Sequence, residues 1–111
     1  MTVYRALEML TVLRGVPQAH VKDEVMNYID ALELHQHVNM RIRYLPPNER
    51  SRLKFAAAVV GAPPVVILDE CTAYQKYSVT RAMYYILYNL RKRGHAIVIS
   101  SSRYSMRIIL F

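Results

Sequence analysis

Residues 62–70, Ala-Pro-Pro-Val-Val-Ile-Leu-Asp-Glu, constrain the fold of this chain more than any other stretch. Two prolines precede four branched apolar residues, and two adjacent acids, Asp69 and Glu70, follow them. This pattern predicts a short, fully buried strand of a parallel sheet. Because open α/β sheets bind ligands at the carboxyl ends of their strands, the pattern also places both acids in a crevice.

Asp69 and Glu70 allow two interpretations. In enzymes that hydrolyse nucleoside triphosphates, the acid at the end of such a strand holds Mg²⁺, and an adjacent acid can orient or deprotonate the attacking water. In the other interpretation, the strand simply ends in two solvated acids. The flanking sequence decides between them.

Apolar residues at helical spacing predict four helices around this strand. The first lies between Thr2, which can cap it, and Gly15, which ends it. The others are expected at residues 21–32, 49–60 and 78–93, with Ser78 as the cap of the last. Residues 38–44 alternate between apolar and polar side chains and are expected to be extended.

Residues 96–100, Ala-Ile-Val-Ile-Ser, predict a second buried strand. The two strands and the helix between them would form one βαβ unit over residues 65–100. The sequence therefore predicts an α/β protein, and its 111 residues suit a single domain.

Charge is unevenly distributed along the chain. Residues 1–70 contain eight Lys/Arg and eight Asp/Glu, whereas residues 71–111 contain seven Lys/Arg and no acid. Such asymmetry can indicate binding to nucleic acid or anionic lipid. The basic residues carry no RNA-binding signature, however, and we do not expect nucleic-acid binding.

Composition excludes several other classes. A single cysteine, Cys71, rules out an internal disulfide framework and fits a reducing compartment such as the cytosol. The longest apolar tract, residues 55–68, contains Gly61 and two prolines, so no membrane span is expected. His35 and His37 form a His-x-His pair with no third ligand nearby, which favours solvated loop histidines over a metal site.

The spacing of Leu45, Arg52, Asp69 and Glu70 resembles the second half of the ATP-binding cassette of ABC transporters. In that family, a Leu-Ser-Gly-Gly-Gln signature opens a helix, an arginine follows three residues after the glutamine, and the Asp-Glu strand comes at a fixed distance. These positions match here without a gap. The opening Thr-Val-Tyr-Arg-Ala-Leu-Glu is most similar to the A subfamily, which is associated with lipid export.

The resemblance implies part of a P-loop NTPase fold: a helical subdomain with the signature region in residues 1–61, and one βαβ unit of the core sheet in residues 62–111. It implies Mg-ATP as the family cofactor, with Asp69 at the magnesium ion and Glu70 as the general base. The implied partners are a transmembrane domain and an opposing cassette, on the cytoplasmic side of a membrane. The family role is ATP hydrolysis coupled to transport.

The sequence departs from the family pattern at the elements that contact phosphate. The P-loop, Gly-x-x-x-x-Gly-Lys-Ser/Thr, is absent, because the glycines, Gly15, Gly61 and Gly94, precede Val, Ala and His. Within the signature, Leu45 is retained, but Pro46, Pro47, Asn48 and Glu49 replace Ser, Gly, Gly and Gln. Two prolines remove two N–H donors, and Glu49 places a carboxylate where an anion would dock.

Two further family positions are changed. Lys76 stands where the family has the Asp of its D-loop, and Ser102 stands where it has the switch His. Asp69 and Glu70 are retained, but two acids without a phosphate cradle do not make an ATPase. We therefore expect a fragment or degenerate form of an A-type cassette that is inactive alone, with no bound cofactor.

The alternative is a non-catalytic module that docks on transmembrane or partner helices. In the resembled fold, the strand that matches residues 96–100 lies between the Asp-Glu strand and the P-loop strand. Because the P-loop strand is missing here, the resemblance implies an unpaired, uncharged edge, and we expect self-association there.

Overall fold

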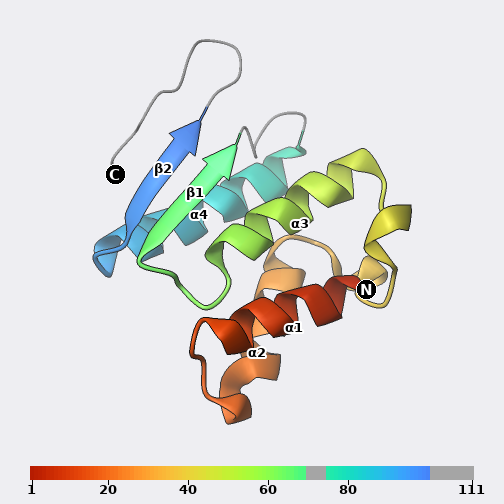
Figure 1. Cartoon of the computed structure of the whole chain (residues 1–111). Helices are drawn as coiled ribbons and strands as arrows, with labels where there is room; N and C mark the ends of the chain where they lie inside the picture. The colour runs from red at the N-terminus through yellow and green to blue at the C-terminus, as the bar shows by residue number, and fades with distance from the viewer. Residues whose placement is uncertain (70–74, 101–111) are drawn as a thin grey trace.

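The computed structural model describes residues 1–69 and 75–100, with only the backbone at residue 100 (Figure 1). Its elements follow in chain order: α1 (Val3–Leu13), α2 (Gln18–Ala31), the 3₁₀ turns η1 (His35–His37) and η2 (Ile42–Tyr44), α3 (Pro47–Val59), β1 (Val65–Asp69), α4 (Tyr77–Lys92) and β2 (Ala96–Ser100). The predicted α/β class is confirmed. All four helices and both strands that the sequence predicts are present, with boundaries shifted by a few residues.

Helices α1, α2 and α3 form a layer of their own beside the sheet (Figure 1). The Thr2 hydroxyl caps α1 as predicted by accepting a hydrogen bond from the backbone N–H of Arg5 at 3.2 Å. On α2, Val21, Val25 and Ile29 recur at helical spacing and are fully buried. Apolar burial between the helices therefore holds this layer together.

The segment between α2 and α3 is not the extended stretch that alternation predicted. It forms two 3₁₀ turns, and the backbone N–H groups of Val3 and Tyr4 donate to the carbonyls of Met40 and Val38 at 3.0 Å. Thr2 and Arg41 form an isolated antiparallel bridge. The prediction was wrong because contacts with the start of α1, distant in sequence, outweigh local alternation.

Strands β1 and β2 pair in parallel, in register from Val65 with Ala96 to Asp69 with Ser100, and α4 connects them. The βαβ unit is thus confirmed. In Figure 1, α4 lies behind the two strands, and α3 lies between the sheet and α1. The contacts of α3 with β1 and of α1 with α3 join the helical layer to the sheet.

The predicted burial of β1 on both faces is wrong. Val66 and Leu68 are buried, but Val65 and Ile67 are 51% and 69% exposed. Only one face of the strand is covered, because no element within residues 1–69 and 75–100 packs on the other. Each strand also has a single neighbour among the described residues, so within them one edge of each strand is unpaired.

Two local features set the ends of the elements. Helix α4 begins after Lys76, and Ser78 does not cap it as predicted, because its hydroxyl donates to the Glu33 carboxylate at 2.7 Å instead. Gly61, after α3, has φ +74°, and a Cβ there would lie 3.0 Å from the Cβ of Arg14.

Within the described part of the chain, no helix has both the length and the apolar character needed to cross a lipid bilayer.

Candidate functional site

Asp69 ends β1, at the carboxyl edge where the sequence places the ligand site. Its side chain is exposed and takes part in interactions. Glu70, the expected general base, and Ser102, at the switch position, lie outside the described residues. Of the acid pair, the structure therefore places Asp69 alone.

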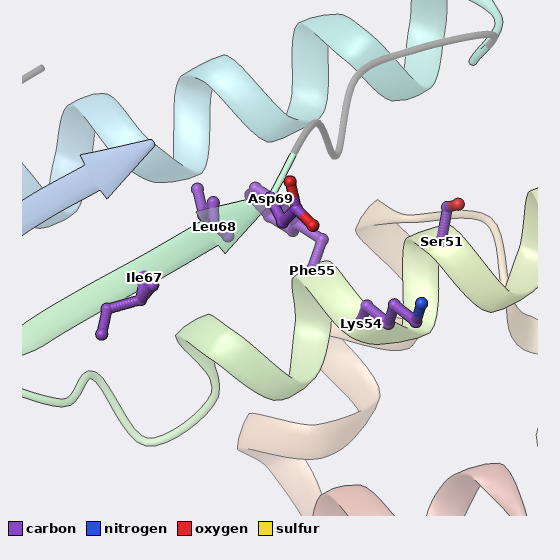
Figure 2. A pocket seen from close by; sticks show the side chains of 6 residues that line it. All are labelled: Ser51, Lys54, Phe55, Ile67, Leu68 and Asp69. Atoms are coloured by element: carbon purple, nitrogen blue, oxygen red, sulfur yellow. The ribbon is translucent and has the colours of Figure 1, made fainter. Parts of the chain in front are cut away.

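A shallow pocket of about 220 Å³ lies between the end of β1 and α3. Figure 2 shows Asp69 at the end of the strand, with Ser51 and Lys54 projecting from α3 and Phe55 between the two elements. The sequence analysis missed Ser51 and Lys54. The available signal was helical spacing, because residues 51, 54 and 55 lie on neighbouring positions of one helix surface.

The degenerate signature forms the start of α3. Leu45 is buried and anchors the segment, whereas Pro46, Pro47 and Asn48 are exposed. Pro46 occupies the cap position without a side-chain cap, and Pro47 is the first helical residue. Since neither proline has an N–H, this helix start has lost donors that a helix N-terminus normally offers to an anion.

The carboxylate of Glu49 is held within the helix. Its Oε1 lies 2.8 Å from Nη2 of Arg52, and the two side chains are only 16% and 7% exposed. Arg52 also donates from Nη1 to the carbonyls of Leu32 and Glu33, both at 3.1 Å. This arginine thus joins the degenerate signature to the end of α2.

Glu33 connects the same region to the start of α4. Its carboxylate lies 2.6 Å from the Lys76 ammonium and accepts the hydrogen bond from Ser78. The hydrogen bond from Lys76, and to a lesser extent the one from Ser78, lowers the pKa of the Glu33 carboxyl below its ordinary value. Glu33 adopts a left-handed conformation, φ +56°, which turns the chain after α2.

The groups within the described residues do not by themselves fit Mg-ATP. Asp69 is the single acid among the described lining residues of the pocket, and the sequence has no glycine-rich phosphate loop. Across residues 1–69 and 75–100, no three His, Cys, Asp or Glu side chains gather into a possible metal site. Residues 1–69 and 75–100 supply neither a second acid beside Asp69 nor the backbone cradle that a nucleotide phosphate requires.

Comparisons with known proteins cover most of the chain, including the start of α3 and strand β1. No family model matches the chain. It is 31% identical over 101 residues to human phospholipid-transporting ATPase ABCA3, a match over 91% of the chain and 6% of that protein. It is 30% identical over 87 residues to a putative ABC transporter ATP-binding protein of Clostridium perfringens, over 78% of the chain and 15% of the relative. The chain therefore spans a small part of these relatives.

Two solved structures share the fold. One, described as the ATP-binding subunit of an ABC transporter, superposes with a TM-score of 0.83 at 14% identity, over 94% of the chain and 43% of the solved chain. The other, described as an inward-facing conformation of a putative metal-chelate type ABC transporter, has a TM-score of 0.63 at 18% identity. The match covers 92% of the chain and 42% of the solved chain. Helical layer and βαβ unit thus occur together in larger solved proteins.

Proposed function

Since the chain is a partial ATP-binding cassette of the ABC-transporter type, similar to those of the A subfamily, we propose that it is a degenerate part that does not hydrolyse ATP by itself. The start of α3 carries this proposal. Pro46 and Pro47 remove two donors there, and the Glu49 carboxylate stands beside them, paired with Arg52. A γ-phosphate would meet fewer donors and a negative charge.

The absent P-loop weakens binding further. A phosphate loop supplies several charge-assisted hydrogen bonds, each worth about 1.5–3 kcal/mol. Even when these contributions are not additive, their loss lowers ATP affinity by orders of magnitude, because about 1.4 kcal/mol is a factor of ten. We propose that the chain alone has no bound cofactor and that Asp69 and Glu70 are idle.

Phosphate release tests this proposal. Purified chain incubated with Mg-ATP should release phosphate at the rate of buffer, and Glu70→Gln should leave that rate unchanged. Calorimetric titration with Mg-ATP should give no saturable heat. A rate above background that disappears in Glu70→Gln would refute the proposal, because it would require a working general base.

In a longer protein, the role that follows from the relatives is participation in ATP-driven phospholipid transport at the cytoplasmic face of a membrane, with a transmembrane domain and an opposing cassette as partners. We propose that residues 1–61 serve there as the helical subdomain and signature region, and residues 62–111 as the part from the Asp-Glu strand to the switch loop. Photo-crosslinking of ATP to a transporter that contains this cassette tests the role. Turnover at the composite site built from residues 45–49 would contradict it.

A second function, docking on transmembrane or partner helices, is favoured by apolar side chains on α1. Met9 and Val12 are each 46% exposed, and Leu13 is 73% exposed. An exposed apolar group of this kind is typical of a contact surface. Neither function requires the chain alone to bind ATP, so the test is co-purification with membrane domains of an A-type transporter, which Leu13→Asp should weaken if α1 is the docking surface.

We further propose self-association through β2. Residues 96–100 carry no charge and have β1 as their one described neighbour, which leaves an edge able to pair with another strand. Light scattering after size-exclusion chromatography should show oligomers that Val98→Lys reduces. A monodisperse wild-type monomer with a cooperative melt would contradict this.

A further inference from the structure

Helix α4 presents an aromatic and basic surface that neither the sheet nor the other helices cover. We call it the tyrosine face, and it consists of Tyr77, Arg81, Tyr84, Tyr85, Tyr88 and Arg91. Its four tyrosines are between 53% and 79% exposed. The buried residues of the same helix include Met83 and Leu87, and the other elements of residues 1–69 and 75–100 leave the tyrosine face largely exposed.

The spacing of the tyrosine face makes it a continuous stripe. Positions 77, 81, 84, 88 and 91 alternate steps of four and three residues, which keeps them on one side of a helix. The fourteen steps from residue 77 to residue 91, at about 1.5 Å each, give a length of about 21 Å. A second helix laid along the stripe would meet a side chain at every turn.

One hollow opens directly beside the stripe. It has a volume of about 250 Å³ and is lined by Tyr84, Tyr88 and Arg91 around the buried Leu87. A recess of this kind accepts an aliphatic side chain from a partner. A second hollow, between α2 and α4, includes the acid Glu24 and is lined by no residue of the stripe, so the stripe does not use it.

The charge of the surface selects the partner. Residues 75–100 contain no acid, and Arg81 and Arg91 stand on the stripe itself. The Lys92 ammonium lies 5.5 Å from the centre of the Tyr88 ring, which adds a cation beside the central tyrosine. Charge complementarity therefore requires an acidic partner.

We propose that the tyrosine face docks an amphipathic helix of a partner protein, with an aliphatic side chain in the hollow over Leu87 and flanking acids on Arg81 and Arg91. Tyrosine and arginine are enriched among the residues that dominate protein interfaces. The recess over Leu87 favours a helix with projecting side chains over a flat bilayer surface or a phosphate backbone. This inference does not depend on nucleotide binding by the chain.

Fluorescence anisotropy with a labelled designed peptide tests the proposal. The peptide is a helix of about 18 residues, long enough for the stripe, with leucine at alternating steps of three and four and glutamate on both flanks. We expect saturable binding that weakens as salt rises. Tyr88→Ala and Arg91→Ala should each weaken it about tenfold, the effect of losing a residue central to an interface.

Matched controls distinguish specific binding at the tyrosine face from nonspecific binding to exposed aromatic and basic side chains. Tyr44 is 64% exposed, with the Arg43 guanidinium 5.0 Å from its ring centre on η2, so Tyr44→Ala and Arg43→Ala should leave binding unchanged. A peptide with lysine in place of glutamate should bind only after charge reversal by Arg81→Glu and Arg91→Glu. Circular dichroism should show unchanged folding, because these side chains are exposed.

Three outcomes would overturn the proposal. The first is no saturable binding of the glutamate peptide below about 1 mM. The second is equal loss of binding in the Tyr44 and Tyr88 variants. The third is tighter binding of phosphatidylserine vesicles, or of a single-stranded DNA oligonucleotide, than of the peptide, which would assign the surface to lipid or to nucleic acid.

Discussion

Arg52 is the side chain on which the junction between α2 and α3 depends most. It is 6% exposed and donates hydrogen bonds to the carbonyls of Leu32 and Glu33 and to the Glu49 carboxylate. Arg52→Met keeps most of the aliphatic volume but leaves two carbonyls and a nearly buried carboxylate without this donor. Breaking a buried ion pair from one side costs about 3–5 kcal/mol, and we expect a loss of that size in the free energy of unfolding.

Urea denaturation followed by circular dichroism measures this loss. With a slope of about 1 kcal/mol per molar urea, this loss lowers the unfolding midpoint by about 3–5 M. Arg52→Lys keeps the charge but loses the guanidinium fork, and we expect a smaller cost of about 1–3 kcal/mol. That variant keeps the test informative if Arg52→Met does not fold.

A double-mutant cycle with Glu49→Gln isolates the ion pair, and we expect a coupling energy of about 1–3 kcal/mol. The control is Arg50→Met on the same helix, because Arg50 is exposed and donates mainly to the Leu45 carbonyl at 3.1 Å. Its cost should stay below about 1 kcal/mol. If Arg52→Met cost as little as the control, or the coupling fell below about 0.5 kcal/mol, the junction would not depend on Arg52.

Three further predictions concern other parts of the fold. The pKa of Glu33 is lowered in the folded chain, chiefly by Lys76, so its contribution to stability is present above the ordinary carboxyl range and is lost as pH falls through the folded value. Lys76→Met should therefore cost up to about 1 kcal/mol in urea melts at pH 7 and less at pH 3, and equal costs at both would contradict this. Burial raises the pKa of Tyr28 to about 12, so stability should fall as pH rises through the window between about 10 and 12. The tyrosinate absorbance of the folded chain should lose its component near 12 in Tyr28→Phe, and an unchanged titration would place Tyr28 elsewhere. Gly61→Ala should destabilise by about 2 kcal/mol more than Gly94→Ala in thermal melts, because both glycines have positive φ but only Gly61 has a side chain 3.0 Å from the added methyl group.

Tertiary contacts changed several expectations about the fold. Segment 38–44 alternates as a strand would, but backbone hydrogen bonds to the start of α1 hold it in turns. Four apolar residues in a row read as a strand covered on both faces, yet Val65 and Ile67 are exposed. The second face of a sheet is buried only when another helix or sheet packs on it, and the residues of the strand do not reveal whether such an element is present.

The sequence by itself determined the α/β class, the order of helices and strands, the parallel βαβ unit and the place of Asp69 at the end of β1. Helical and strand periodicity are local properties, which explains why they could be read from the chain alone. The lack of a glycine-rich loop and of two N–H groups at Pro46 and Pro47 is likewise covalent, and no folding can restore them.

The tertiary structure alone decided which side chains meet. It brought Lys54 and Asp69 to one pocket, set Arg52 against the carbonyls at the end of α2, and set Glu33 against Lys76 and Ser78. Glu33 and Ser78 stand 45 positions apart in the chain. Hydrogen bonds and ion pairs act over a few ångströms in space, so such contacts depend on how the helical layer docks on the βαβ unit, which local sequence periodicity does not encode.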